Sequence, residues 1–324
     1  MCDFESGIVY RLQYSASVFE KFDLATVIFS CCTLLINPLA LYFTFKVTID
    51  ANLSSILIML EITSEALAAI AQIGNTFCPY FLATPYRWIN VLTCHMWTNE
   101  FLISIFNSFC RQNILGMTVE RCLNTFFPDT DLLRYPKIIA GIYCFSWAYN
   151  LVSNLYLVLF VELNDTGQCS IVPETMINRT ELLAFRYISI VLIDIIPIVL
   201  VMTVFFLILL HRYKHKRKTN FIAKQQIGGN KQIQKQLDCL VLIWSSLGVM
   251  INVGDLLLDG LYANKDNRFV FRVIYQSLQL FRSFTFIIRS VTLFLILSPM
   301  RNKILLCKNN IVIYLRLWKN KPSI

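Results

Sequence analysis

Residues 24–46 read LATVIFSCCTLLINPLALYFTFK, and the only charged side chain among them is the last one, Lys46. A helix needs roughly 20 predominantly apolar residues to cross the hydrocarbon core of a bilayer. This run is therefore long enough and apolar enough to span a membrane. Residues 1–23 carry scattered charges and lack the uninterrupted apolar core of a secretory signal peptide, so we expect the run itself to direct insertion.

The composition of the whole chain also indicates an integral membrane protein. Of its 324 residues, 56% are hydrophobic and only 15% are charged, and the mean hydropathy is +0.58. A soluble domain has about a quarter of its residues charged, so this chain has too little polar surface to coat a water-soluble body. The net charge of +9 does not indicate nucleic-acid binding, because the basic residues cluster between apolar runs.

Seven such runs occur along the sequence. They lie at about 24–46, 54–76, 95–123, 138–161, 184–210, 237–261 and 271–297. We therefore predict an all-α membrane protein in which a seven-transmembrane helix bundle occupies residues 24–297. Residues 1–23 precede the bundle, and residues 298–324 form a tail in which a short amphipathic helix can lie along the membrane.

Lys and Arg are distributed unequally between the two sides of this bundle. One side, made of residues 46–53, 121–137, 211–236 and 298–324, carries 18 of them, and the segments on the other side carry 6. Basic residues are enriched on the cytoplasmic side of a membrane, so we predict a cytoplasmic carboxyl terminus and, with an odd number of crossings, an extracellular amino terminus. The basic stretch at 211–218 contributes mainly to this topology and to contact with anionic lipid.

The predicted outer face holds candidate modification sites. Asn164 and Asn178 begin N-glycosylation triplets in the loop between the fourth and fifth runs. Cys94 and Cys169 lie on the same face, where oxidation is allowed, and a disulfide between them would hold that loop over the mouth of the bundle. On the inner side, Cys307 is either palmitoylated or a plain free thiol.

The sequence lacks the patterns of several protein classes. It has 11 Cys but no Cys-x-x-Cys motif, and its three His show no metal-ligand spacing. It also has no catalytic Ser/His/Asp set and no phosphate-binding loop. We therefore expect neither an enzyme nor a cofactor or metal site.

Two polar stripes run along otherwise apolar stretches. Helical spacing relates Trp244, Gly248, Asn252, Asp255 and Asp259 in the sixth run, and Tyr275, Gln279, Arg282 and Arg289 in the seventh. Lipid cannot satisfy such groups, so both stripes are expected to face the interior of the bundle. One interpretation is a ligand pocket, formed by Glu100, Ile103, Asn107, Asp194, Asn252, Asp255, Gln279 and Arg282. The other is a set of structural ion pairs, and the two are compatible.

The end of the third run carries a recognisable motif. It reads Ile114-Leu115-Gly116-Met117-Thr118-Val119-Glu120-Arg121-Cys122-Leu123, and Pro128 follows seven residues after the Arg. In these residues the chain resembles a rhodopsin-like (class A) G-protein-coupled receptor, of a divergent, invertebrate peptide- or chemoreceptor-like kind. The resemblance covers essentially the whole chain, since Asn37, Glu65, Trp147, Pro197 and Trp244 fall near other landmark positions of the family, with Glu65 standing where Asp is usual. It departs from the family pattern at Cys122, where Tyr is usual, and at Thr292-Leu293-Phe294-Leu295-Ile296, where Asn-Pro-x-x-Tyr is usual.

The resemblance implies a function. Such a protein is a plasma-membrane receptor that binds an extracellular ligand and activates a heterotrimeric G protein, with arrestin as a further partner. An amine ligand is disfavoured because Ile103 stands where amine receptors carry Asp. A retinal pigment is excluded because residues 271–297 hold no Lys for the Schiff base. A peptide, including a neuropeptide, or a small polar molecule remains.

The resemblance also implies roles for residues inside the bundle. Glu120, Arg121 and Trp244 are the expected switch, with the Glu120–Arg121 pair holding the resting state. Residues 211–237 contain no Asp or Glu to hold this Arg from the sixth helix, which predicts a weak lock and some ligand-free signalling. A buried polar network is expected to consist of Asn37, Glu65, Arg111 and Arg289, in which Arg replaces the sodium ion that the family keeps.

A multi-pass transporter or channel is the main alternative. Buried Glu, Asp and Arg also mark ion pathways through membranes. Transporters are commonly built from internal repeats, and the sequence shows no such symmetry. The receptor interpretation is therefore preferred over the transporter.

Overall fold

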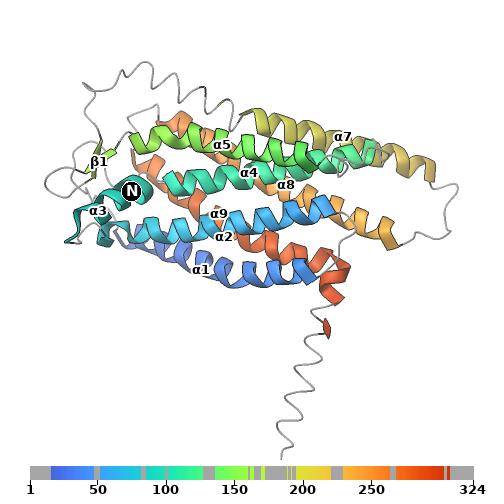
Figure 1. Ribbon diagram of the computed structural model, residues 1–324, viewed down its shortest axis with the longest axis horizontal. Coiled ribbons are helices and arrows are strands. Elements are labelled where there is room, and N and C mark those ends of the chain that lie inside the picture. The colour runs from blue at the N-terminus through green and yellow to red at the C-terminus, as the bar shows by residue number, and fades with distance from the viewer. Residues whose placement is uncertain are drawn as a thin grey trace, which may run out of the picture.

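The computed structural model describes residues 16–46, 52–81, 85–98, 101–126, 136–159, 161–163, 169–171, 188, 191, 195–219, 229–262, 268–302 and 305–306. Within these residues the protein is almost entirely helical (Figure 1). The long helices are α1 (Ala16–Lys46), α2 (Asn52–Phe81), α4 (Phe101–Phe126), α5 (Pro136–Leu159), α7 (Ile196–Thr219), α8 (Gly229–Tyr262) and α9 (Arg268–Ile296). They lie side by side along the longest axis of the molecule (Figure 1).

Four stretches of helix are long and apolar enough to cross a membrane. They are Lys21–Lys46, Leu53–Phe77, Gln232–Leu258 and Val273–Ile296, which belong to α1, α2, α8 and α9. Their positions agree with the predicted spans 24–46, 54–76, 237–261 and 271–297. The helix α4 lies centrally, since it packs against α2, α5, α7 and α8.

The start of the third predicted span differs from expectation. The prediction placed a membrane helix from residue 95 and a loop before it, whereas a short helix α3 (Arg87–Thr93) is followed directly by a π-helix η1 (Cys94–Thr98). Only at Phe101 does α4 begin. A π-turn is set by local packing rather than by hydrophobic periodicity, so the apolar run gave no sign of it.

The basic stretch after the fifth run also differs from expectation. The prediction placed residues 211–236 in a loop, but α7 continues to Thr219 and α8 begins at Gly229. Lys, Arg and Gln favour helix, so both helices extend past the ends of their apolar runs. The extension adds Gln234 to α8, where its side chain contacts Arg121 of α4.

The distribution of side chains is the reverse of that in a soluble protein. Leu35 and Phe45 of α1 are each 72% exposed, and Phe145 of α5 is 73% exposed. The carboxyl-bearing Glu61 and Glu65 of α2 are completely buried. Apolar groups outside and polar groups inside are expected where the surrounding solvent is lipid, so the surface agrees with a membrane protein.

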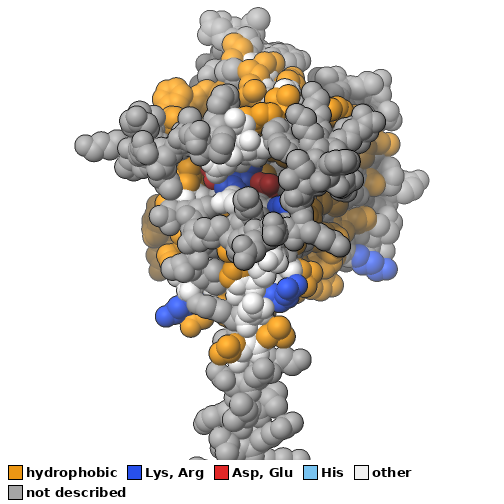
Figure 2. All heavy atoms as spheres, turned by 90° about the vertical axis from the view of Figure 1, so that its right-hand side faces the viewer, with side chains coloured by type: hydrophobic (Ala, Val, Ile, Leu, Met, Phe, Trp, Pro, Cys, Tyr) orange, Lys and Arg blue, Asp and Glu red, His pale blue; other side chains and the backbone are white. Residues whose placement is uncertain are grey.

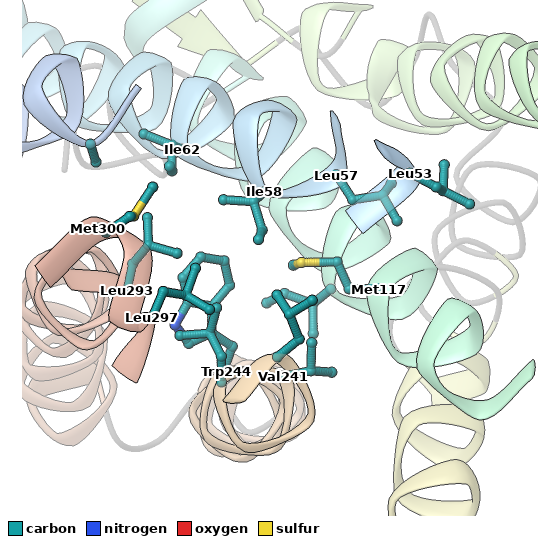
Figure 3. Packing of buried hydrophobic residues seen from close by; sticks show 14 residues of the cluster. Leu53, Leu57, Ile58, Ile62, Met117, Val241, Trp244, Leu293, Leu297 and Met300 are labelled. Carbon is teal, nitrogen blue, oxygen red and sulfur yellow. The ribbon is translucent and has the colours of Figure 1, made fainter. Parts of the chain in front are cut away.

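The largest apolar core lies around Trp244 of α8, which is completely buried (Figure 3). Side chains from α2, α4 and α9 surround it, among them Ile58, Met117 and Leu293. Its indole N–H donates to the hydroxyl of Thr292 at 3.0 Å. This bond joins α8 to α9.

Candidate functional site

Among the described residues, three clusters of charged side chains lie between the helices. The first is the Arg121 cluster, formed by Ser54, Glu120, Arg121, Gln234 and Asp238. Arg121 is only 1% exposed, and its Nε donates to Glu120 Oε2 at 2.6 Å. Its Nη2 also donates to the hydroxyl of Ser54 at 2.7 Å, and Ser54 in turn donates to Glu120 at 2.9 Å. Arg121 is therefore a buried, paired base rather than a side chain that reaches out to lipid phosphate.

The same Arg contacts α8, which corrects one expectation. Arg121 Nη1 donates to the side-chain oxygen of Gln234 and lies 3.9 Å from Asp238 Oδ1. The expectation that no acid of the sixth helix reaches Arg121 was based on residues 211–237 and overlooked Asp238, the next residue, which lies inside the predicted span 237–261. The ligand-free signalling that a weak lock would allow stays a prediction.

The Arg121 cluster lies near the end of the bundle where α4 finishes and α8 starts. Figure 2 looks onto this end, which is the right-hand end in Figure 1. Among the residues drawn in colour, acidic and basic side chains meet at the centre of this face, further Lys and Arg side chains lie toward its edges, and apolar side chains are visible on its flanks (Figure 2).

The second group, the deep cluster, consists of Glu61, Glu65 and Arg289. Arg289 Nη1 lies 2.7 Å from Glu61 Oε1 and 3.1 Å from Glu65 Oε1. The two acids are four residues apart and therefore on one face of α2, so a single guanidinium from α9 meets both. Asn37 lies nearby, where its Nδ2 donates to the backbone oxygen of Ile62 at 3.0 Å.

The expected buried network is thus found in part. Asn37, Glu65 and Arg289 lie together as predicted, and Ser290 joins them by donating to Asn37 Oδ1 at 2.7 Å. Arg111 of α4 was also predicted to belong to this group, but its guanidinium lies beside Asp255 of α8 instead. The guanidinium of Arg289 lies beside Glu65 of α2, and the replacement of a sodium ion by Arg stays a prediction.

The third group, the cavity cluster, consists of Arg111, Asp255 and Arg282. Arg282 pairs directly with Asp255, which ties α9 to α8. Arg111 Nη1 lies 3.7 Å from the other oxygen of Asp255, and Arg111 Nη2 donates to Ser108 at 3.3 Å. One carboxylate is therefore shared between two guanidiniums from different helices.

A cavity of about 30 Å³ lies beside this cluster. That volume holds one or two water molecules. Its described lining comes from α4, α7, α8 and α9, and includes Asn107, Arg111, Asn252, Asp255, Arg282 and Arg289. Gly248 also lines the cavity. A Cβ at that position would lie 3.3 Å from Ile114 and 3.7 Å from Arg289, so a larger residue would crowd these two side chains.

The structure brings together part of the predicted ligand site. Asn107, Asn252, Asp255 and Arg282 line the cavity. Ile103 is buried but is not among the lining residues. The side chains of Glu100, Asp194 and Asp259 lie outside the described part of the chain.

Gln279 was also predicted to contact the ligand, but it lies in another network. It accepts a hydrogen bond from Gln72 at 3.1 Å and donates to Tyr275 at 3.0 Å. Gln72 also accepts from Ser30 and Ser283, which joins α1, α2 and α9. Sequence reasoning missed this network although its signal was present, since isolated polar residues in apolar runs must find partners inside the bundle.

The predicted outer modifications are only partly described. Cys94 is buried and disulfide-bonded. The strand β1 (Val161–Leu163) packs against η1 and pairs antiparallel with β2 (Cys169–Ile171). The side chains of Cys169, Asn164, Asn178 and Cys307 lie outside the described residues, so the identity of the disulfide partner stays a prediction.

Comparison with known proteins adds no family. No protein-family model and no curated protein matches the sequence. Function must therefore be inferred from the chain's own residues and their geometry.

Proposed function

We propose that the protein is a seven-transmembrane, G-protein-coupled receptor of the plasma membrane that binds an extracellular ligand. The observation that carries this proposal is that α4 and α8 each contribute to two separate polar sites. α4 supplies Arg111 to the cavity and Arg121 to the Arg121 cluster, ten residues or about 15 Å further along the helix. α8 supplies Asp255 to the first site and Asp238 to the second.

The proposed mechanism follows from this shared pair of helices. A ligand that enters the cavity and binds one packing of α4 against α8 better than another shifts the populations of the two. The favoured packing separates α8 from α4 at the far end and releases Arg121 from Gln234 and Asp238. The freed guanidinium then meets the G protein, and Trp244 lies on α8 between the two sites.

The proposed topology has the amino terminus outside and the carboxyl terminus in the cytoplasm. Four helices meet the requirements for a membrane span, and α4, α5 and α7 are proposed to cross as well. The lipid-type surface of α5 and α7 supports this, since Phe145 and Phe206 are 73% and 62% exposed. The excess of Lys and Arg on one side supports the orientation.

Several finer features belong to the same proposal. We propose that Cys94 pairs with Cys169, which is supported by the packing of β1 against η1 and by the pairing of β1 with β2, the strand that begins at Cys169. Asn164 and Asn178 carry glycans on the outside. Cys307 is a palmitoylation site or a free thiol on the inside, and arrestin is a further partner.

The direct test is nucleotide exchange by a heterotrimeric G protein on the purified protein in lipid nanodiscs, screened against peptides and polar metabolites. We expect at least one ligand to accelerate exchange, and Arg121→Ala to abolish the acceleration while ligand binding persists. Arg301→Ala, which removes an exposed Arg beyond α9, is the matched control and should leave exchange unchanged. Ligands that bind without affecting any G protein would contradict the receptor proposal.

A transporter or channel is the second candidate, and the deep cluster is the observation that favours it. Completely buried acids paired with Arg are typical of proton and ion pathways in membranes. Substrate uptake or charge movement in proteoliposomes that Glu65→Gln abolishes would support this candidate. The absence of both, together with ligand-dependent nucleotide exchange, would support the receptor.

A further inference from the structure

The short helix α3 has apolar side chains on its outer face and polar side chains on its inner face. Trp88 and Leu92 are four residues apart and therefore on one face, and they are 67% and 46% exposed. Asn90 and Thr93 are buried instead. A helix that lies against water turns its apolar face inward, so this arrangement indicates that the outer face of α3 borders an apolar medium.

The position of α3 places it at the surface of a bilayer. It lies at the end of the molecule where α2 finishes, and it packs against α2, η1 and β1 (Figure 1). The apolar stretch Leu53–Phe77 of α2 has 25 residues, or about 37 Å of helix, which is enough to cross the roughly 30 Å hydrocarbon core. Because α3 follows this stretch in the chain and packs on the end of α2, it lies at the depth of the lipid headgroups.

The exposed face of α2 leads towards this end. Its exposed side chains Ile56, Thr63, Ile70 and Phe77 recur every seven residues, which places them in one stripe along the helix. Three of the four are apolar, as expected for a surface in lipid. The stripe ends at Phe77, close to the end of α2 at Phe81. The apolar face of α3 therefore extends a lipid-facing surface at its end.

The exposed residue types are those that prefer the membrane surface. Trp and Tyr are enriched at both membrane–water interfaces, because each has an apolar ring with one polar group that reaches the headgroups. Trp88 and the preceding Tyr86 supply exposed rings at this end of the molecule. At the opposite end, Tyr42 of α1 is 55% exposed and lies close to Lys46, the last residue of that helix. Exposed rings of this kind thus occur at both ends of the bundle.

We propose that α3 is a membrane-surface anchor, in which Trp88 and Leu92 insert into the boundary between lipid headgroups and acyl chains beside the end of α2. This inference goes beyond the proposed receptor function and rests only on its membrane topology. The helix α3 is followed directly by η1, which begins at the disulfide-bonded Cys94 and packs against α4 and α5. The anchor therefore holds the outer end of α4 at a fixed depth in the bilayer.

The test measures the depth of Trp88 in the purified full-length protein in nanodiscs. Tryptophan fluorescence is recorded with phosphatidylcholine that carries bromine, a quencher, either near the headgroup or near the ends of the acyl chains. The chain has five Trp, so the contribution of Trp88 is the difference between the natural protein and Trp88→Phe. We expect bromine near the headgroup to remove most of this contribution, and bromine near the chain ends to remove less than half as much, because indole rings sit at headgroup level. Iodide, which stays in water, should remove less than headgroup bromine does.

Trp147 of α5 is the matched control. It is 40% exposed and lies in the middle of α5, where its ring stacks on Phe109. The difference between the natural protein and Trp147→Phe should show the opposite order, with stronger quenching by bromine near the chain ends.

A second variant tests the face of α3 independently of the natural Trp. Leu92→Trp, combined with Trp88→Phe, puts the fluorophore on the same face at another exposed position. Its fluorescence should be quenched in the same order as that of Trp88. Quenching of this variant by iodide alone would count against the anchor.

Three results for Trp88 would overturn the proposal. Strong quenching by iodide with little quenching by either lipid would place α3 in water. Protection from iodide and from both lipids would mean that another part of the chain or a second copy covers this face. Stronger quenching by bromine near the chain ends would place α3 inside the hydrocarbon core. None of these results bears on nucleotide exchange, which tests the receptor function separately, and a lack of lipid quenching at Trp147 would contradict only the proposed crossing of α5.

Discussion

The deep cluster and the cavity cluster use the same chemistry in different surroundings. In the deep cluster one guanidinium contacts two carboxylates, all at most 2% exposed, and it joins α2 to α9. In the cavity cluster the guanidiniums of Arg111 and Arg282 contact the carboxylate of Asp255 at 10–15% exposure, beside free space, and both Arg have further partners. The two clusters therefore differ in exposure and in adjoining space, and these features make the cavity cluster the better candidate for ligand binding.

The largest effect is expected from removing the base of the deep cluster. Arg289→Met leaves Glu61 and Glu65 buried and without a counter-charge, and breaking a buried pair from one side costs about 3–5 kcal/mol. We expect a large loss of the free energy of unfolding, measured by denaturant or thermal unfolding in nanodiscs. The triple variant with both acids changed to Gln should recover most of the loss. If Arg289→Met were as stable as the natural protein, Glu61 and Glu65 would have to be hydrated, and the cluster would not be buried as described.

A smaller loss is expected when the acid of the cavity cluster is removed. Asp255→Asn takes away the carboxylate that both guanidiniums contact, but these groups are partly hydrated, so we expect a cost of about 2 kcal/mol. A loss as large as that of Arg289→Met would mean that the cavity cluster contributes as much to stability as the deep cluster.

The Arg121 cluster should respond in activity more than in stability. Asp238→Asn weakens one contact between α4 and α8, worth about 1 kcal/mol, which changes the ratio of the two packings about fivefold. We expect higher nucleotide exchange without ligand. Lys235→Gln, at an exposed position of the same helix, should leave basal exchange unchanged. Basal exchange that stays at the level of empty nanodiscs would contradict the lock.

The smallest effect is expected from neutralising one acid of the deep cluster. Glu61→Gln leaves Arg289 paired with Glu65 and makes the buried group electrically neutral, so stability should change by about 0.5 kcal/mol or less, or increase. Glu61 Oε2 already lacks a hydrogen-bond partner among the described residues, so little is lost there. A loss of several kcal/mol would show that both carboxylates are needed as charges.

Much of this arrangement follows from periodicity. The stripes that contain Asp255 and Arg282 could be assigned to the bundle interior because lipid cannot satisfy them, and both do line the cavity. The spacing of Glu61 and Glu65 likewise allows one partner to meet both. The pairing of each Arg could not be predicted, since a rotation of α4 by part of a turn decides whether Arg111 meets Glu65 or Asp255.

The misses share a physical cause. Hydrophobic runs locate the apolar part of a helix and not its polar ends, so the extension of α8 that carries Gln234 to Arg121 gave no hydropathy signal. The π-helix η1 begins at the buried, disulfide-bonded Cys94, and hydrophobic periodicity does not mark a π-helix. The size of the cavity depends on how side chains from four helices fill one space, which no single run encodes.

The central claim is that a ligand in the cavity moves α8 away from α4 at the Arg121 cluster. The most direct test places spectroscopic labels on non-cysteine side chains at Phe126 of α4 and Lys235 of α8, both exposed, so that Cys122 and Cys239 stay unchanged. The distance between the labels is measured in nanodiscs with and without a ligand that accelerates nucleotide exchange. The claim predicts that this ligand lengthens the distance. An interlabel distance that is the same in both samples, under conditions where the ligand binds, would contradict it.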